Sequence, residues 1–474
     1  MSSFSALNGA FTALTAQRLA LEVTGQNISN VNTVGYTRQR AGMEAIGGSA
    51  HPTMFATNGA PAIGVRVTSI DRLGSIFMET QLRTQTASAS QLQAVAGTWQ
   101  LIETTLKEPG ENGLASSLDT FFTSWEDVGN RPDDDAAKSV LLGNAAALTS
   151  AIANGYRAVE TQWNSTREQT SALADDINTT AVAVADLNGR IRDAQVAGNN
   201  ANALIDQRGV LLDGLAGLVG AEVRERPDGS VDVMIGGNAL VRGDRSYAVA
   251  VHGSQTLATL ATHATEPADG WDSQHGPARL VWADSGHPAG ATGGRISGLL
   301  DSAAPDGPIA AMAETYNELA TTLATEVNAL HSSVPAADGS TRDFFALAGG
   351  TTPAAIGLSV ALTGTDQVIT GNADEVDGTL AAKISELSGA RDTWAGAVTE
   401  VGVSSRAATR RAQAAETTRM SAEAQLLSQT AVDIDEESVN LVMYQRAYEA
   451  SARVITTIDE MLDTLINRTG VVGR

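Results

Sequence analysis

The chain has 474 residues, of which 43% are hydrophobic, and a formal net charge of −23 from 54 acidic and 31 basic residues. This length allows roughly three domains, and the apolar content is that of a globular rather than a disordered protein. The negative charge argues against a nucleic-acid partner. Because cysteine is absent, disulfides, thiolate metal sites and cysteine nucleophiles are excluded.

The N-terminal residues, MSSFSALNGAF, show no basic segment followed by an apolar core and a cleavage site. No run of eighteen apolar residues predicts a membrane span. We therefore expect a chain that stays in the cytoplasm or leaves it by a route that needs no cleaved signal.

An amphipathic helix is predicted over residues 3–31. Its apolar positions recur at alternating steps of three and four, with Arg18 and Gly25 as interruptions. Asn32 and Gly35 follow, and such residues favour helix ends and turns. The residues of this apolar seam are Leu7, Phe11, Leu14, Leu21 and Ile28.

The part of the chain up to residue 220 is predicted to be mostly helical. Pro132 and the acidic run 133–135 mark the start of a long helix, because carboxylates are favourable in the first turn. A seam that continues to Ile191 predicts a rod of about 60 Å, at about 1.5 Å per residue. The predicted elements are an extended linker at 36–60, a strand at 64–70, and helices at 76–107, 114–125, 133–197 and 203–219.

From residue 221 the period changes from helical to alternating. Runs of valine separated by Pro-Asp-Gly and Gly-Gly-Asn predict strand, turn and strand. We expect β structure over 221–304, a helix at 309–330, a small irregular or β insert at 332–380, and helix again over 381–428.

The last helix, residues 433–465, carries a second seam with the same spacing. Asp433 is a suitable N-cap, and Glu436 stands where a capping box needs it. A helix of this kind is either packed on a core or kept for assembly, and its narrow stripe favours assembly. The residues of this seam are Leu441, Tyr444, Tyr448, Ser451, Ile455, Ile458, Leu462 and Leu465.

The two seams at opposite ends of the chain predict a terminal helical hairpin into which everything else is inserted. The predicted fold class is mainly α with β insert domains: a terminal α-helical coiled-coil hairpin, a long-helix bundle and an outer β-rich part. The predicted domains are a terminal coiled-coil assembly domain (1–40 and 432–474), a helical bundle (41–220, 305–331 and 381–431), a β-rich outer domain (221–304) and a small insert (332–380).

Residues 27–40, NISNVNTVGYTRQR, resemble the N-terminal signature of the bacterial flagellar axial proteins, the family of rod, hook and hook-associated proteins. Residues 439–467 resemble the C-terminal signature of that family. The segments 113–148, 204–243 and 293–301 are similar to its hook-associated members. The signature positions in this chain are Asn27, Asn30, Gly35, Tyr36, Arg38, Gln39, Gln445 and Tyr448.

This resemblance implies a structural subunit with no cofactor, no metal and no catalytic residue. It implies a ring of copies at the hook–filament junction, with the hook protein below and a second junction protein above. The ring would adapt a flexible hook to a rigid filament and would be required for filament assembly. The resemblance also implies passage through the flagellar export apparatus, an export chaperone at the C-terminal region, and an extracellular location on the flagellum.

The chain departs from the family pattern at two positions. Val34 stands where the family usually has proline, and Ala431 stands where it often has glycine before the last helix. We expect the second change to stiffen the entry into that helix, because alanine has fewer backbone conformations than glycine.

Two alternatives to this assignment remain open. The first is another axial protein, either the hook protein or the second junction protein. Residues 113–148 argue against both and favour the member that forms the first ring of the junction. The second is an enzyme with its site in the β insert. The six histidines are scattered, and neither a HExxH nor a GxSxG motif occurs, so no residue pattern supports an enzyme.

Overall fold

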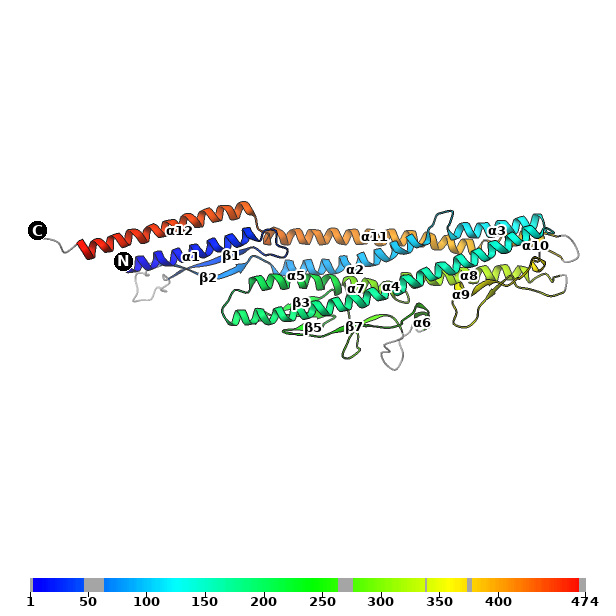
Figure 1. Ribbon diagram of the computed structural model, residues 1–474, viewed down its shortest axis with the longest axis horizontal. Helices are drawn as coiled ribbons and strands as arrows, with labels where there is room; N and C mark the ends of the chain where they lie inside the picture. The colour runs from blue at the N-terminus through cyan, green and yellow to red at the C-terminus, as the bar shows by residue number, and fades with distance from the viewer. Residues whose placement is uncertain (1–2, 47–63, 263–275, 337–338, 373–376, 469–474) are drawn as a thin grey trace, which may run out of the picture.

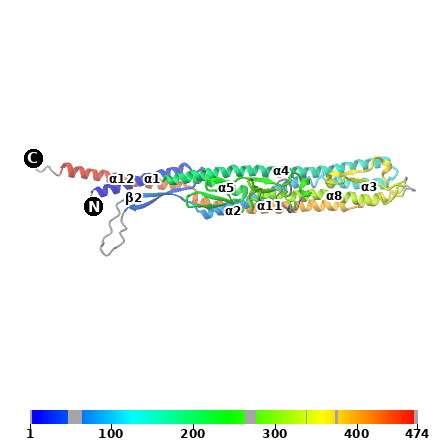
Figure 2. The ribbon, with the colours of Figure 1, turned by 90° about the horizontal axis from the view of Figure 1, so that it is seen from below.

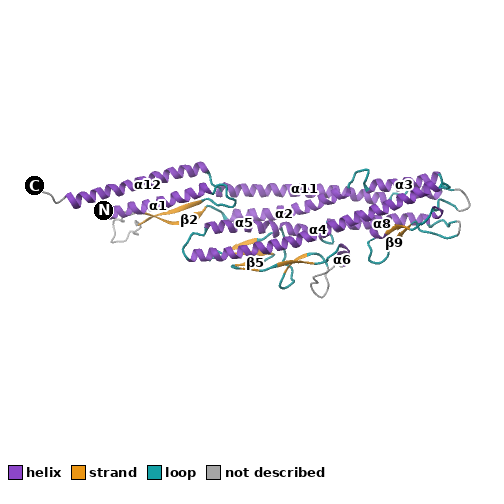
Figure 3. Ribbon diagram, in the orientation of Figure 1, coloured by secondary structure: helices purple, strands orange, loops and turns teal. Residues whose placement is uncertain are grey.

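The computed structural model describes residues 3–46, 64–262, 276–336, 339–372 and 377–468. Figures 1 and 2 show an elongated molecule in which nearly parallel helices form a rod and both chain ends lie at the same end of it. Helices make up most of the chain, and small sheets lie along one side (Figure 3). The predicted fold class, mainly α with β inserts, is confirmed.

The helices fall close to their predicted positions, which follow from apolar periodicity. The terminal pair consists of α1 (Ser3–Ser29) and α12 (Ile434–Asp463), and α12 continues into a π-helical turn, Thr464–Arg468. The helices of the body are α2 (Ile76–Leu106), α3 (Leu114–Asn130), α4 (Asp135–Val196), α5 (Asn202–Val219), α6 (Leu257–Thr262), α7 (Gly294–Ala303), α8 (Pro308–His331), α9 (Ala354–Gly357), α10 (Thr379–Ser385) and α11 (Gly389–Thr430).

Helix α4 is the longest element, with 62 residues, which corresponds to a length of about 93 Å. The side chain of Asp134 caps it by accepting hydrogen bonds from the backbone N–H groups of Ala136 and Ala137, at 2.9 and 3.4 Å. By length and composition alone, part of α4 would qualify as a membrane span. Its apolar side chains instead pack inside the bundle: Leu141, Ile152 and Trp163 are fully buried.

The end of the rod far from the chain termini holds the larger core. Phe121, Phe122 and Trp125 of α3, predicted as an aromatic face, are fully buried there. The insert 332–380 contributes Phe344 and Phe345 to the same cluster, and Phe344 lies 5.1 Å from Trp125, centroid to centroid. The insert contains β9 (Phe345–Leu347), β10 (Leu358–Val360) and a 3₁₀ turn, Thr365–Gln367.

The strands between residues 222 and 282 form two small antiparallel sheets. Val231, Val233 and Ile235 alternate inward and pack with Leu173 and Ile177 of α4. The sheets therefore bury one face on helices and share their core. The first sheet has the order β3 (Glu222–Glu225), β4 (Val231–Ile235), β5 (Asn238–Arg242), β6 (Arg245–Ser246), and the second pairs β7 (Val249–His252) with β8 (Arg279–Trp282).

Three sequence expectations differ from the structure. Residues 39–46 of the expected linker are a strand, β1 (Gln39–Ile46), because β2 (Gly64–Arg72) pairs with it antiparallel; residues 47–60 lie outside the described residues. Residues 294–303, expected to be part of the β region, form α7, because Ile296 and Leu299 pack into the core of α4 and α5. The helix expected over 381–428 is divided between α10 and α11.

The C-terminal end of α8 holds a buried histidine. His331 Nδ1 donates to the carbonyl of Arg342 at 2.7 Å, and Nε2 accepts from the N–H of Ile369 at 3.1 Å. These partners tie both halves of the insert to α8 and need the neutral ring. Burial lowers the pKa of His331 below its usual 6.5, although the Arg342 carbonyl and the Asp343 carboxylate oppose this shift.

We expect acid to destabilise this end of the rod through His331. A group with a lowered folded-state pKa contributes stability that is complete above pH 6.5 and is lost as the pH falls through the folded-state value. Urea unfolding at about pH 7.5 and about pH 5 measures this loss. The matched variant His331→Gln should lose less stability between the two pH values than the native chain. Equal losses would show that His331 does not carry the effect.

Candidate functional site: the terminal helix pair and its joint

The terminal helices form a separate pair at one end of the rod. Helices α1 and α12 run antiparallel and pack side by side, while β1 and β2 pack against α1 as well (Figure 1). Among the described residues, α12 packs mainly against α1. The partner that buries the seam of α12 is therefore in the same chain.

The predicted seam residues lie in this pair. Ile458 is buried and Leu465 is exposed, and the other large α12 seam residues are half-buried. On α1, Phe11 is exposed, and the other seam residues are half-buried. The half-buried seam residues are Leu7, Leu14, Leu21, Ile28, Leu441, Tyr444, Tyr448, Ile455 and Leu462.

Several deeply buried positions of α1 are small apolar residues that the sequence analysis did not select. Ala10, Ala16, Ala20 and Val23 are each less than a tenth exposed. Alanine lets backbones approach closely, which suits a helix placed between another helix and a strand pair. The sequence signal was the spacing of Ala16, Ala20 and Val23, which keeps steps of four and three.

A second apolar stripe on α12 lies beside the seam and is exposed. Val439, Met443, Val454 and Met461 are between 48% and 68% exposed. They are spaced by four, eleven and seven residues, close to whole numbers of helical turns, so they share one face. Four large apolar side chains in line on one exposed helix face are characteristic of an interaction surface.

The joint between the terminal pair and the rod is built around Asn27, which is 1% exposed. Its Oδ1 accepts from the backbone N–H of Gln39 at 3.0 Å and from the hydroxyl of Tyr36 at 2.8 Å. Its Nδ2 donates to the carbonyl of Gln39 at 2.8 Å and to Glu437 Oε2 at 3.2 Å. All four bonding positions of one amide therefore join α1, the following loop and α12.

Arg38 connects the same loop to both long C-terminal helices. Its guanidinium contacts Glu437 at 2.7 Å and Glu436 at 2.6 Å, and its backbone N–H donates to the carbonyl of Thr430, at the end of α11, at 2.9 Å. Burial alone would lower the pKa of Arg38, but the bonds to the two carboxylates raise it overall. The guanidinium therefore stays charged and keeps its ion pairs with the two carboxylates at the start of α12.

A third set of contacts fixes the loop to α5. Asp206 accepts from the Arg72 guanidinium at 2.8 Å and from the backbone N–H of Thr37 at 3.3 Å. Asn202 donates to the side chain of Gln39 at 3.0 Å. Burial raises the pKa of Asp206, and the Arg72 charge opposes this. The sequence did not reveal four of these residues, because their partners are distant in sequence: Arg72, Asn202, Asp206 and Glu437.

The signature positions divide into two groups. Asn27, Gly35, Tyr36, Arg38 and Gln39 meet at the joint. Gly35 has φ = +77°, and a Cβ there would collide with Val210 of α5, so only glycine fits. Burial, with the nearby Asp206 and Glu437 charges, raises the pKa of Tyr36 to about 12. The positions outside the joint are Asn30, which bonds locally, and Gln445 and Tyr448 on α12.

The two positions that depart from the family pattern also lie at the joint. Val34 is 87% exposed, and Ala431 is the C-cap of α11 in extended conformation. Both line a pocket of about 530 Å³ between the loop and the ends of α5 and α11. The extended backbone at Ala431 is open to any residue, so alanine fits where glycine is usual.

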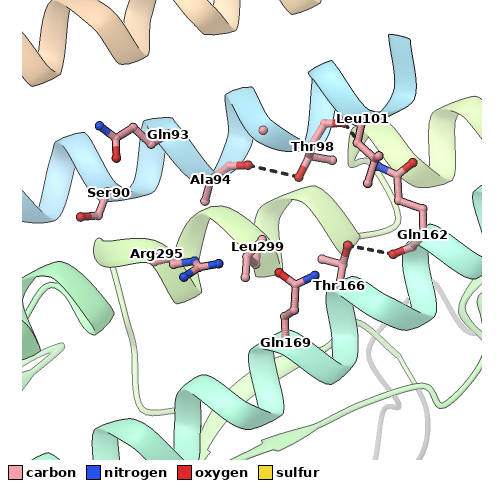
Figure 4. A pocket seen from close by; sticks show the side chains of 11 residues that line it. Ser90, Gln93, Ala94, Thr98, Leu101, Gln162, Thr166, Gln169, Arg295 and Leu299 are labelled. Atoms are coloured by element: carbon pink, nitrogen blue, oxygen red, sulfur yellow. Dashed lines mark hydrogen bonds between the residues drawn. The ribbon is translucent and has the colours of Figure 1, made fainter. Parts of the chain in front are cut away.

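Figure 4 shows a pocket of about 400 Å³ between α2, α4 and α7, lined by neutral amides and hydroxyls with one cation, Arg295. In the part of the chain that the structure describes, no group of three His, Cys, Asp or Glu side chains could hold a metal ion.

Three family models match the chain. The model described as "Flagellar hook-associated protein FlgK helical domain" matches residues 99–345. The model "Flagella basal body rod protein" matches residues 7–37, and "Flagellar basal body rod FlgEFG protein C-terminal" matches residues 423–468. The two smaller matches coincide with α1 and α12.

Several relatives share the name flagellar hook-associated protein 1. The protein of Bacillus subtilis (strain 168) is 28% identical over 519 aligned residues, covering 100% of both chains. That of Escherichia coli (strain K12) is 30% identical over 52% of this chain and 44% of the relative. That of Salmonella typhimurium is 29% identical over 72% and 59%. The matches thus span less than two thirds of the last two relatives.

A solved structure, described as the flagellar hook junction protein FlgK from Burkholderia pseudomallei, has a TM-score of 0.48 and 24% sequence identity. The match covers 57% of this chain and 47% of that one.

We expect the joint to weaken when Glu437 is truncated, because Arg38 and Asn27 then lose a buried partner. Glu437→Ala should lower the local opening free energy by about 1.5–3 kcal/mol. Glu436→Ala is the matched control, since it removes an exposed partner of the same arginine and should cost under about 1 kcal/mol. Hydrogen exchange of the amides of residues 36–40 and 434–440 measures both. Similar exchange in the two variants would contradict the central role of Glu437.

Proposed function

We propose, on the premise that this chain belongs to the family of the flagellar hook-associated protein FlgK, that it forms the junction ring between hook and filament. Membership rests on the helical-domain model, which matches more than half of the chain. The chain is therefore a structural, hook-associated protein of the bacterial flagellum. Its rod-type terminal segments mark it as one that associates with other axial components of the flagellum.

The exposed stripe on α12 is the observation that carries the ring proposal. Because the predicted seam of α12 packs against α1, we assign the contact with neighbouring subunits to exposed apolar residues of α12: Val439, Met443, Val454 and Met461. Its spacing suits another helix packed alongside. The placement of both chain ends at one end of the rod would put the stripes of all subunits at the same level of a ring (Figure 1).

The joint supports the proposed role as an adaptor. A subunit that couples a flexible hook to a rigid filament must transmit torque between its inner helices and its outer body. Buried hydrogen bonds of Asn27 and the ion pairs of Arg38 and Arg72 resist bending at this point. We therefore place the rigid element of the subunit at residues 36–40.

The proposed partners follow from this location. They are copies of the chain itself in the ring, the hook protein below and a second junction protein above. An export chaperone would bind the C-terminal region, and the flagellar export apparatus would deliver the subunit to the cell exterior. We propose no catalytic activity, because the family is structural and the joint carries bonding rather than reactive groups.

A strain that lacks this chain tests the proposal. Electron microscopy should show hooks without filaments, and the culture medium should contain unassembled filament subunits. Expression of the native chain should restore filaments and swimming. Normal filaments in its absence would overturn the proposed function.

Two substitutions separate the stripe from the seam. Val454→Asp places a charge on the exposed stripe, so the melting temperature of the purified chain should stay unchanged while attachment of filaments is lost. Ile458→Asp buries a charge against α1 and should lower the melting temperature as well. Calorimetry and filament counts measure the two effects.

The control for both is Thr456→Asp, an exposed position that lies away from both stripes on the same helix. It should keep both stability and filaments. The seam residues Leu14 and Leu462 should behave like Ile458, since they are half-buried in the helix pair. If Val454→Asp cells swim normally, the stripe is not the assembly surface.

A further inference from the structure

The outer face of α11 carries a group of unopposed positive charges. Between residues 401 and 415 the sequence has three arginines, Arg406, Arg410 and Arg411, and no acidic residue. All three are exposed, and Arg406 and Arg410 stand one turn apart on one face. This face is positively charged, although the whole chain has a net charge of −23.

The outer face of α4 has the opposite charge. Glu168, Asp175 and Asp176 are exposed, and the stretch 161–182 contains one base, Arg167, whose guanidinium is turned to the carbonyl of Ser254 at 2.9 Å. Glu168 and Asp175 are seven residues apart and share a face. The rest of this face consists of small residues.

The two faces lie on opposite sides of the rod, and the acidic face is about 16 Å nearer the joint, so the rods of neighbouring copies must be inclined to the ring axis for the two faces to meet. Figure 4 shows α2 (blue) and α7 (yellow-green) between α11 (orange) and α4 (teal). Gln162 of α4 donates to the carbonyl of Thr98, and Gln100 donates to Thr409 of α11. At about 1.5 Å per residue, Glu168 of α4 is therefore level with about residue 417 of α11. Helices α4 and α11 also run in the same direction, from the far end towards the joint (Figure 1).

We propose that the arginine face of α11 docks against the acidic face of α4 in the next copy of this chain. This inference rests on the proposed ring. A ring of identical subunits needs two different, complementary surfaces on opposite sides of each subunit, which these faces provide. Two copies that each carry a net charge of −23 repel, and the arginine face offsets this repulsion where the bodies of two copies meet.

The apolar residues of the two faces fit the same register. Met420 follows Arg406 at the same interval at which Val182 follows Glu168, and both are about half exposed. With Arg406 beside Glu168, the pair Arg410 and Arg411 comes near Asp175 and Asp176, and Met420 meets Val182. The small side chains between them allow the two helices to approach closely.

Charge reversal tests the docking. The variants Arg410→Glu with Arg411→Glu, and Asp175→Arg with Asp176→Arg, should each reduce the amount of chain bound to isolated hooks by about tenfold, because like charges then face each other. The combination of all four substitutions should restore most of the binding, since the attraction is reversed but intact. Circular dichroism and melting of the secreted variants exclude misfolding.

A cross-link tests the contact independently of stability. The native chain has no cysteine, so the pair Thr179→Cys and Thr417→Cys introduces the only thiols. In the proposed register these positions meet between copies, and oxidation of isolated hook tips should give multimers through disulfides. The control pair, Ser150→Cys and Thr417→Cys, uses the same face of α4 at a distant height and should give none.

The outcomes separate the two proposals. If the native chain is absent from hook tips, the proposed function fails. If it is present but neither charge reversal reduces binding and Thr179→Cys with Thr417→Cys gives no multimers, the ring stands and the α11–α4 docking is overturned. Loss of binding on single reversal without recovery in the fourfold variant also overturns the pairing.

Discussion

The arrangement of this molecule depends on one buried amide. Asn27 has no water to bond, so its four bonding positions must be satisfied by the protein, and an unsatisfied buried polar group is costly. Its partners, Gln39, Tyr36 and Glu437, come from the loop and from a helix four hundred residues further along the chain. The two ends of the chain can meet this requirement only when they are placed together, so the joint determines where the terminal pair points.

The terminal helices therefore have two separate tasks. One side of α12 is covered by α1, and this contact completes the subunit. The other side keeps Val439, Met443, Val454 and Met461 exposed. A helix that is marginal alone becomes ordered through the first contact, and its second stripe is then presented on a fixed backbone.

Local patterns in the sequence predicted most of the elements. The helical period placed α1, α4, α8 and α12 within a few residues of their ends, because each buries one apolar stripe. The strand β1 was missed because residues 39–46 have polar and small side chains, and their pairing with β2 is the only signal. The residues of helix α7 were placed in the β region because they begin with glycines. Their packing on α5 and α4 makes them helical nevertheless.

The candidate site was predictable in part. The family signature and the seams identified Asn27, Arg38 and the large apolar residues. They did not identify Glu437, Arg72 or Asp206, because an ion pair between distant segments leaves no periodic trace. The same limit applies to the stripe on α12, since its valines and methionines differ from the seam only in the direction they face.

The length of α4 has a mechanical consequence. The joint holds the rod through α5 and α11, so the rod, which contains this helix of about 93 Å, is a lever arm. A tilt of about 5° at the loop that holds Arg38 would move the far tip of the rod by about 8 Å, which exceeds one helical turn of about 5.4 Å. A slight change of angle at the joint can therefore shift the contacts of the far tip by a whole helical turn.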